Sequence, residues 1–304
     1  MAPANDLIPA NYRRQLGMSG LLPTAQPMRN VQKAAQFGKF FTYRHAITLT
    51  AAQQGARDTI GIDGESDFEL RKIAVLADNR GVNFQMILTP LQEAFMSLPS
   101  FLSHYGSGQR PFVVNPAMIL KRSSQFSGVF DDRRLVQVGD NAIVVAYHGA
   151  KVYNTPIVTP RRYDIAKPYL PYLANLTAFD GGQGSVPANG TATFNIRTDS
   201  DSDFEVQKIT ICSDGPILIQ ITTDQDNWFR NPLPGELLGA ENIETVLGGG
   251  PNGFSGEFPF VLPAPRFITA AAYITTEITN LLTDAANRVQ VGYHGVRLYP
   301  AGGR

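Results

Sequence analysis

The chain has 304 residues, of which 43% are apolar and 17% are charged, and its formal net charge is zero. This length and apolar content predict about two globular domains, each able to bury its own core. The single cysteine, Cys212, excludes an intramolecular disulfide, and we expect it to lie buried and inert within a strand. Nowhere do 18 apolar residues follow one another, and no continuous apolar stretch lies near the N-terminus, so we expect neither a membrane span nor a signal peptide.

The first 41 residues lack a periodic pattern, because four prolines interrupt them and their apolar residues are scattered. Charge is also uneven: residues 1–44 hold six basic residues and one acidic, whereas residues 177–304 hold seven basic and fourteen acidic. We therefore predict an extended N-terminal arm that buries apolar side chains on a neighbouring subunit, with direct nucleic-acid contact as the less favoured alternative. The arm residues expected to contact a partner are Arg13, Arg14, Leu21, Leu22 and Arg29.

Beyond the arm, the chain contains one pattern twice. SDFELRKI at 66–73 returns as SDFEVQKI at 202–209, and YHGAKVY at 147–153 returns as YHGVRLY at 293–299. Because solenoid repeats have periods of about 20 to 50 residues, these spacings indicate a duplicated domain. Two further matches lie between these anchors in the same order, pairing 84–89 with 219–223 and 111–113 with 259–261.

Short β-branched runs bounded by glycine, asparagine and aspartate follow in both copies, a pattern typical of antiparallel sandwiches. The predicted fold is all-β, with two tandem homologous antiparallel β-sandwich domains of jelly-roll type behind the extended arm. The expected segments are the arm at 1–41, domain 1 at 42–153, a proline-rich linker at 154–176 and domain 2 at 177–300.

Two segments between the strands differ in their pattern. Apolar residues recur at helical spacing from Pro90 to Tyr105, so a short helix is expected there, interrupted by Pro99. The matching part of copy two, Trp228 to Gly250, is rich in glycine and proline and is expected to form a long loop that makes a contact copy one cannot make.

Acidic residues alternate before each SDFE anchor, and Asp199, Asp201 and Asp203 are the strongest candidates for a cation site. An EF-hand is excluded, because Phe204 and Thr210 stand where its loop needs glycine and glutamate. A solvated turn explains the run better, so no metal and no cofactor are expected.

Catalytic motifs are absent from the sequence. The repeated His148 and His294 have no second histidine or cysteine at ligand spacing, and no GxSxG, HExxH or CxxC pattern occurs. We therefore expect no enzymatic activity. Aromatic residues in the long loop of copy two could instead form a binding platform. The residues of that platform would be Trp228, Phe229 and Phe254.

Three pieces of copy two carry a resemblance to a known family. Asp203 to Ile209, Pro259 to Ile268 and Val289 to Tyr299 together resemble structural proteins of tailed-bacteriophage virions. The likeness covers most of residues 177–300 and less of 42–156, where Pro111 to Leu120 departs from it. The resemblance implies a decoration, minor capsid or head-vertex protein, assembled in the host cytoplasm into the virion.

Three classes of function follow. The first is a non-enzymatic virion structural protein that associates with itself and with other virion proteins, either decorating the capsid or forming it as a double jelly roll. The second is a receptor- or carbohydrate-binding spike protein. The third is an enzyme on a β-scaffold, for which the sequence supplies no constellation of residues.

Overall fold

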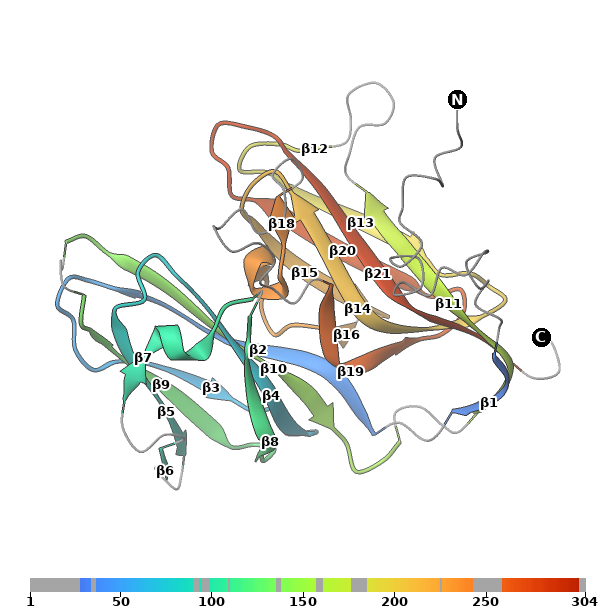
Figure 1. Ribbon diagram of the computed structural model, residues 1–304, viewed down its shortest axis with the longest axis horizontal. Helices are drawn as coiled ribbons and strands as arrows, with labels where there is room; N and C mark the ends of the chain where they lie inside the picture. Colours follow the sequence, from blue (N-terminus) through green and yellow to red (C-terminus); the bar gives the residue numbers. More distant parts are fainter. Residues whose placement is uncertain are drawn as a thin grey trace, which may run out of the picture.

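The computed structural model describes residues 28–33, 37–89, 93–94, 99–108, 110–134, 138–156, 161–175, 185–224, 226–242 and 259–300. Within them nearly all regular structure is β, arranged as two sandwiches side by side (Figure 1). The two sandwiches confirm the all-β fold predicted from the repeats.

Domain 1 is a sandwich of two antiparallel sheets. Its first sheet has the order β2, β10, β4, β8, and its second has the order β3, β9, β5, with β6 and β7 both paired along the outer edge of β5. The bounds are β2 Gly38–Leu49, β3 Ala56–Gly61, β4 Asp67–Ala77, β5 Val82–Thr89, β6 Glu93–Ala94, β7 Ser100–Phe101, β8 Phe112–Leu120, β9 Gln125–Asp132 and β10 Asn141–Val152.

Domain 2 repeats this plan. Its first sheet orders β11, β21, β14 and β19, and its second orders β13, β20 and β15, with β16 and β17 along the edge of β15. The bounds are β11 Arg161–Asn175, β13 Thr191–Arg197, β14 Asp203–Ser213, β15 Ile217–Thr223, β16 Asp226–Asn227, β17 Leu233–Pro234, β19 Phe260–Ile268, β20 Tyr273–Asn280 and β21 Asn287–Pro300. Three short strands extend this domain: β1 Met28–Lys33 on β11, β12 Ser185–Val186 on β21 and β18 Glu241–Asn242 on β14.

The strand order in each domain is that of a jelly roll. Successive long strands alternate between the two sheets, and the fifth strand of the eight is split into two pieces of two residues each. The registers also coincide, because Tyr147 lies opposite Ile73 and Tyr293 lies opposite Ile209. The two halves of the chain therefore share topology and register.

The segments between the fourth and sixth strands, β5 to β8 and β15 to β19, are more alike than their sequences indicate. Neither the helix expected from Pro90 nor the loop expected from Trp228 is found in the described residues. Each copy instead adds two short strands to its fourth strand, β5 or β15, and then forms one 3-10 turn, η2 at Leu102–Tyr105 and η3 at Gly235–Leu238. Pro99 cannot continue a helix, and edge pairing satisfies the backbone that a helix would have satisfied.

The proline-rich stretch expected to be a linker is a strand. Its residues 161–175 form β11, between β1 and β21. Among the described residues, β1 pairs only with 161–166, so at Pro168 and Pro171 the strand β11 has β21 as its one described neighbour, and proline is tolerated on such an edge strand. At the arm, β2 begins at Gly38, so residues 38–41 are strand rather than arm.

The repeated YHG has a steric explanation. A Cβ on Gly149 would overlap the carbonyl oxygen of Glu69, and one on Gly295 would overlap that of Glu205. Both glycines sit where the ladder between the last strand and the third, β10 with β4 and β21 with β14, shifts register. The close backbone approach at this bulge requires glycine in both copies.

The basic residue two positions after each YHG glycine ties the repeated motifs together. Lys151 Nζ lies 2.5 Å from Asp63, and Arg297 Nη2 lies 2.7 Å from Asp199 and 2.9 Å from Asp201. Because Asp63 and Asp199 occupy equivalent positions, both copies use the acidic turn to hold the last strand.

We expect Gly149→Ala to destabilise the protein by about 1–3 kcal/mol, because its methyl group must displace the backbone of Glu69. Thermal unfolding would measure this as a lower Tm. Gly61→Ala is the matched control, since nothing lies within 4 Å of its new Cβ. Equal Tm values for the two variants would contradict the steric explanation.

Candidate assembly surfaces

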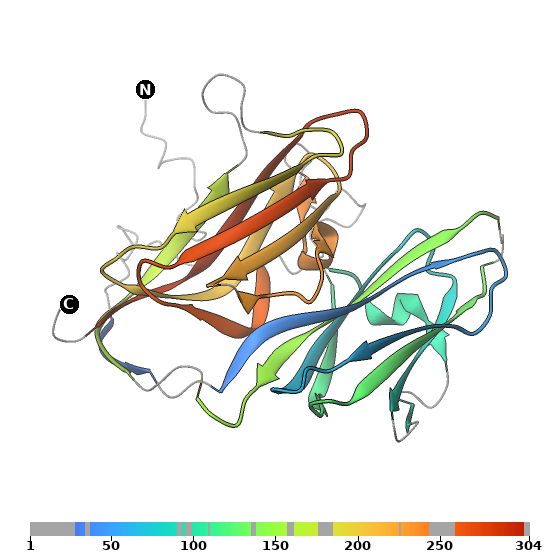
Figure 2. The ribbon, with the colours of Figure 1, turned by 180° about the vertical axis from the view of Figure 1, so that it is seen from behind.

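The two domains meet where the outer face of the β2–β10–β4 sheet packs against β19 and the segment 226–238. Figure 2 shows β2 running from the first domain along the second. Phe40, near the start of β2, is fully buried among the core side chains of domain 2. The Thr42 N–H donates to the carbonyl of Trp228 at 3.2 Å, and the Arg230 N–H donates to the carbonyl of Thr42 at 3.1 Å. The junction therefore includes backbone pairing as well as side-chain packing.

Phe260 is the aromatic centre of this junction. Its ring centroid lies 6.1 Å from that of Phe40 and 5.1 Å from that of His148. Lys72 covers the ring with its Nζ 5.2 Å from the centroid, and donates to the carbonyl of Val261 at 3.1 Å. A buried ring that packs on aromatics and under a cation contributes more than its buried area alone.

A carboxylate between two cations closes the rim of the junction. Asp226 lies 2.6 Å from Lys39 Nζ of domain 1 and 2.5 Å from Arg266 Nη1 of its own domain. Burial raises the pKa of Asp226, but the charges of Arg266 and Lys39 outweigh it and hold the pKa below its ordinary value. Asp226 therefore stays ionised and neutralises Arg266, which is 4% exposed.

His148 is a neutral histidine inside the junction. Its side chain is fully buried, and its Nδ1 lies 3.0 Å from Thr42 Oγ1. Burial, with the nearby charge of Lys72, lowers the pKa of His148 to about 3. Charging the buried ring would place a second cation close to Lys72 and away from water.

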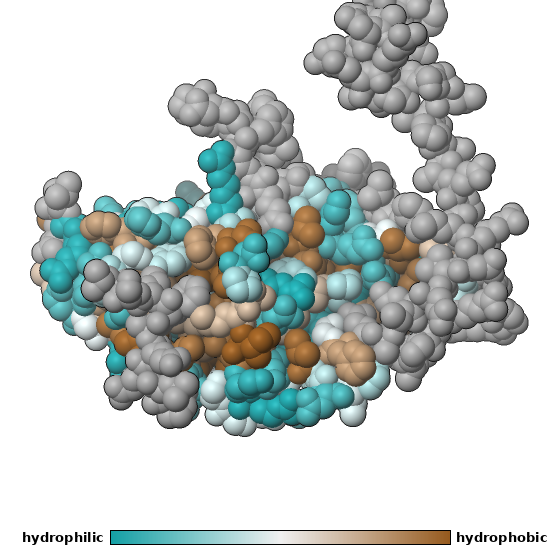
Figure 3. Space-filling model, turned by 60° about the horizontal axis from the view of Figure 1, so that its bottom comes forward, coloured by the Kyte–Doolittle hydropathy of each residue, from teal (hydrophilic) through white to brown (hydrophobic). Residues whose placement is uncertain are grey.

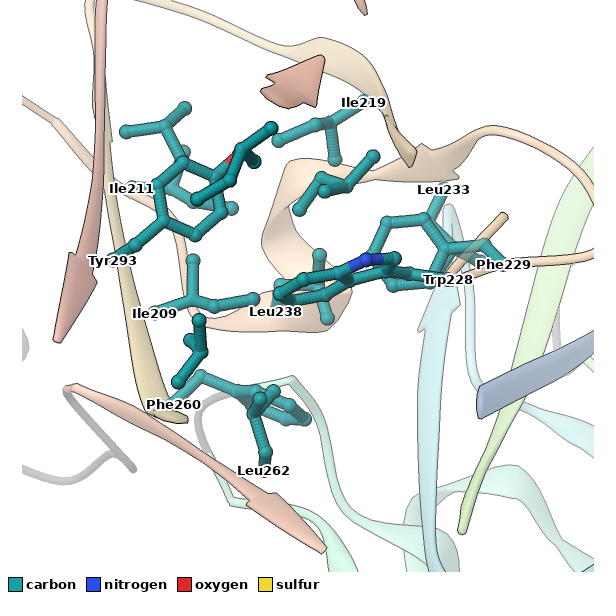
Figure 4. Packing of buried hydrophobic residues seen from close by; sticks show 14 of the residues in the cluster. Ile209, Ile211, Ile219, Trp228, Phe229, Leu233, Leu238, Phe260, Leu262 and Tyr293 are labelled. Carbon is teal, nitrogen blue, oxygen red and sulfur yellow. The ribbon is translucent and has the colours of Figure 1, made fainter. Parts of the chain in front are cut away.

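The prediction of an exposed aromatic platform is wrong for Trp228 and Phe229, two of its three residues. Trp228 and Phe229 are both fully buried, and they pack with Leu238 and Tyr293 in the core of domain 2 (Figure 4). The indole N–H of Trp228 donates to Thr223 Oγ1 at 2.5 Å, so even its polar atom is satisfied inside. Glycine and proline around these residues indicated a loop, but the short strands β16 and β17 turn the rings inward.

Most other predicted contact residues lie outside the described residues. These are Phe254 and the arm residues Arg13, Arg14, Leu21 and Leu22. Arg29 lies in β1, where its backbone is opposite Ile165 of β11. The end of the arm is thus an added strand of domain 2 in the same chain.

The three candidate metal ligands, Asp199, Asp201 and Asp203, bind groups of the protein itself. Asp199 and Asp201 pair with Arg297, while Asp203 is buried and accepts bonds from the Tyr163 hydroxyl and the Ala270 N–H. These three carboxylates therefore do not converge on a metal site, and no group of three or more potential metal ligands occurs within the described ranges. Cys212, expected to be buried, is only half-buried, because its side chain points to the outer face of β14.

One exposed surface was missed in the sequence. Four large apolar side chains of domain 1 are exposed on its β7 and β8 edge, and Figure 3 shows apolar surface gathered across this side of the molecule. They are Phe101 at 44%, Phe112 at 40%, Val113 at 62% and Ile119 at 49%. Next to this edge, a cavity of about 370 Å³ lies between β8 and β19, with Arg71 and Lys72 in its wall. Exposed apolar patches of this kind mark interaction surfaces.

No family model matches the chain, and no curated protein matches it either. Among solved structures, a chain of Sulfolobus turreted icosahedral virus is 12% identical, with a TM-score of 0.22, covering 86% of this chain and 95% of that one. The major capsid protein of bacteriophage PM2 is 10% identical, with a TM-score of 0.22, covering 86% and 100%. A recombinant N-glycanase F is 11% identical, with a TM-score of 0.23, covering 86% and 96%. At this level of similarity no function is transferred from these neighbours.

In the described part of the chain, no helix is long and apolar enough to cross a membrane.

Replacing Phe40 should destabilise domain 2 although the residue belongs to a strand of domain 1. Phe40→Ala removes a fully buried ring, so we expect a loss of about 3–5 kcal/mol in the free energy of unfolding. Chemical denaturation followed by the fluorescence of Trp228, the only tryptophan, would report this loss in domain 2. Phe101→Ala, at an exposed ring, is the control and should change stability by less than about 1 kcal/mol. A Phe40→Ala protein as stable as the control would show that the junction is dispensable.

His148 should make the junction sensitive to acid. Its folded pKa is lowered to about 3 whereas an unfolded histidine titrates near 6.5, so between these values only the unfolded state binds the proton. The stability that the protein gains from burying a neutral His148 is therefore fully present above about pH 6.5. As the pH falls toward 3, the free energy of unfolding decreases by about 1.4 kcal/mol per pH unit.

The test compares the pH dependence of unfolding in three proteins. Between about pH 6.5 and about pH 4, where an unfolded histidine takes up its proton, His148→Gln should lose less stability than the wild type. His104→Gln, at an exposed position, should follow the wild type. Parallel curves for all three would exclude His148 as a source of acid sensitivity.

Proposed function

We propose that this chain is a non-enzymatic structural protein of a virion, and that it builds or reinforces a bacteriophage shell through contacts between its own copies. The observation that carries this proposal is the union of two jelly rolls of one topology through a buried junction centred on Phe260. A rigid pair of such domains is a building block for a closed surface. Its exposed apolar edge on β8 provides a place for a further subunit.

The same observations rank the alternatives. A shell-forming double jelly roll is favoured over a decoration protein, because both domains have the complete strand set. A carbohydrate-binding spike is disfavoured, because Trp228 and Phe229 are buried in the core and present no platform. We propose no catalytic role and no cofactor, since the buried histidines and acids of the described residues serve the scaffold. The site of assembly would be the host cytoplasm, and the site of action the virion.

Purified particles offer the direct test. Mass spectrometry of intact, nuclease-treated virions should find the chain in many copies, and a particle reconstruction should place both jelly rolls in the shell. A chain that is absent from particles, or that sits only on peripheral fibres, would refute the proposal.

The basic N-terminal arm should serve assembly through apolar contacts. Truncation must remove only residues 1–27, because β1 and Phe40 belong to domain 2's sheet and core. We expect the truncated chain to fold but to enter particles poorly, with a defect that changes little with salt. A defect that is present at low salt and disappears at high salt would indicate phosphate contacts instead, and normal incorporation would remove the arm from assembly.

A further inference from the structure

The junction within one chain has a duplicated but unused counterpart. In the junction, β19 of domain 2 supplies Phe260 and Val261, and the sheet of domain 1 receives them at Lys72 and His148. Because the chain is a duplication, domain 1 has its own edge equivalent to β19, and domain 2 has its own face equivalent to that receiving sheet. Within one chain, neither of these two surfaces can meet the other domain in the same way.

The counterpart edge is β8. Phe112 lies opposite Ile73 and Val113 opposite Lys72, just as Phe260 lies opposite Ile209 and Val261 opposite Lys208. Their environments differ sharply. Phe260 is fully buried and Val261 is 40% exposed, whereas Phe112 is 40% exposed and Val113 is 62% exposed.

The counterpart face is the outer side of β14 and β21. Lys208 and His294 are cross-strand neighbours there, as Lys72 and His148 are in domain 1. Lys208 is exposed and His294 is half-buried, whereas His148 is covered completely. His294 also has a threonine partner, but a different one: its Nε2 lies 2.9 Å from Thr210 Oγ1 of β14, whereas His148 bonds Thr42 of β2 through Nδ1.

A third position supports the equivalence. Arg71 donates to the carbonyl of Pro263 across the junction and also binds Glu69 two residues earlier. Gln207 stands at the equivalent position in domain 2, and its side-chain amide donates to Glu205 at 3.2 Å, again two residues earlier. The amide retains an N–H that can reach a carbonyl, as the guanidinium does.

We propose that the β8 edge of one copy docks on the β14–β21 face of a second copy, repeating the junction between the two domains. Phe112 packs on His294 under Lys208, and Lys208 donates to the carbonyl of Val113, as Lys72 does to Val261. Such a contact joins two different surfaces, so it continues head to tail from copy to copy and forms a ring or a filament. Its place in a shell rests on the proposed function, but the contact itself is a property of the purified chain.

Sedimentation velocity over a range of concentrations tests the contact. The wild type should self-associate, and Phe112→Ser and Lys208→Glu should each weaken association by about tenfold or more, as truncation of an aromatic anchor does. Tyr273→Ser is the matched control, since Tyr273 is 50% exposed on the other sheet of domain 2. A monomeric wild type, or association that Phe112→Ser and Lys208→Glu leave unchanged, would overturn the proposal.

Cross-linking between two marked chains tests the geometry. In a Cys212→Ser background, a tagged chain with Val113→Cys is mixed with an untagged chain with Gln207→Cys. These positions are the equivalents of Val261 and Arg71, which line one cavity at the junction, and they leave Phe112 in place. Oxidation should give a product containing both chains, and replacing Gln207→Cys by Tyr273→Cys should abolish it. Self-association without this product would overturn the proposed pairing.

The outcomes also separate this inference from the proposed function. Self-association through Phe112 in a chain that is absent from virions would refute the virion role and keep the contact. A chain abundant in virions whose Phe112→Ser and Lys208→Glu variants assemble normally would refute the contact and keep the role.

Discussion

The fold depends on a single strand that supplies two hydrophobic cores. Successive side chains of β2 point to opposite faces, so Phe40 enters the core of domain 2 while Phe41 enters the core of domain 1. Neither ring can leave its core without moving the other, because they are neighbours on one extended backbone. This constraint makes the junction between the sandwiches part of both cores rather than a contact between finished domains, and it fixes where Phe260, His148 and Asp226 must lie.

The repeated sequence motifs are explained by this scaffold. The glycine of YHG admits a carbonyl of the third strand, the basic residue two positions after it binds the acidic turn, and the tyrosine packs inside its sandwich. The histidine behaves differently in the two copies, since His148 is covered by a domain and His294 is not. The histidine is present in both copies but fully buried in only one, so the outer face of domain 2 is the uncovered equivalent of the face at which domain 1 contacts domain 2.

Sequence periodicity predicted the all-β fold and the duplication because alternating strands and repeated anchors are local signals. It failed where the outcome depended on distant partners. The prolines of β11 indicated a connector, and only pairing with β21 and β1 shows why a strand tolerates them there. Trp228 and Phe229 lay in a glycine-rich context, and their burial depends on β15 and β2. For the same reason the exposed Phe112 was missed, since its exposure is evident only beside its buried equivalent, Phe260.

The two edges that border the junction are built to bind through side chains rather than by adding strands. In β8, residues 114–117 bulge out of the ladder with Pro116 among them, and in β19 residues 262–265 do the same with Pro263 and Pro265. Bulges and prolines on an edge strand interrupt the row of backbone donors that another strand would need. An exposed apolar edge blocked in this way resists indiscriminate sheet extension yet keeps Phe112 and Val113 available. Association at β8 therefore requires a surface that fits those side chains. The face of domain 1 at Lys72 and His148 already receives the equivalent residues, Phe260 and Val261, and its own equivalent in domain 2 is the β14–β21 face.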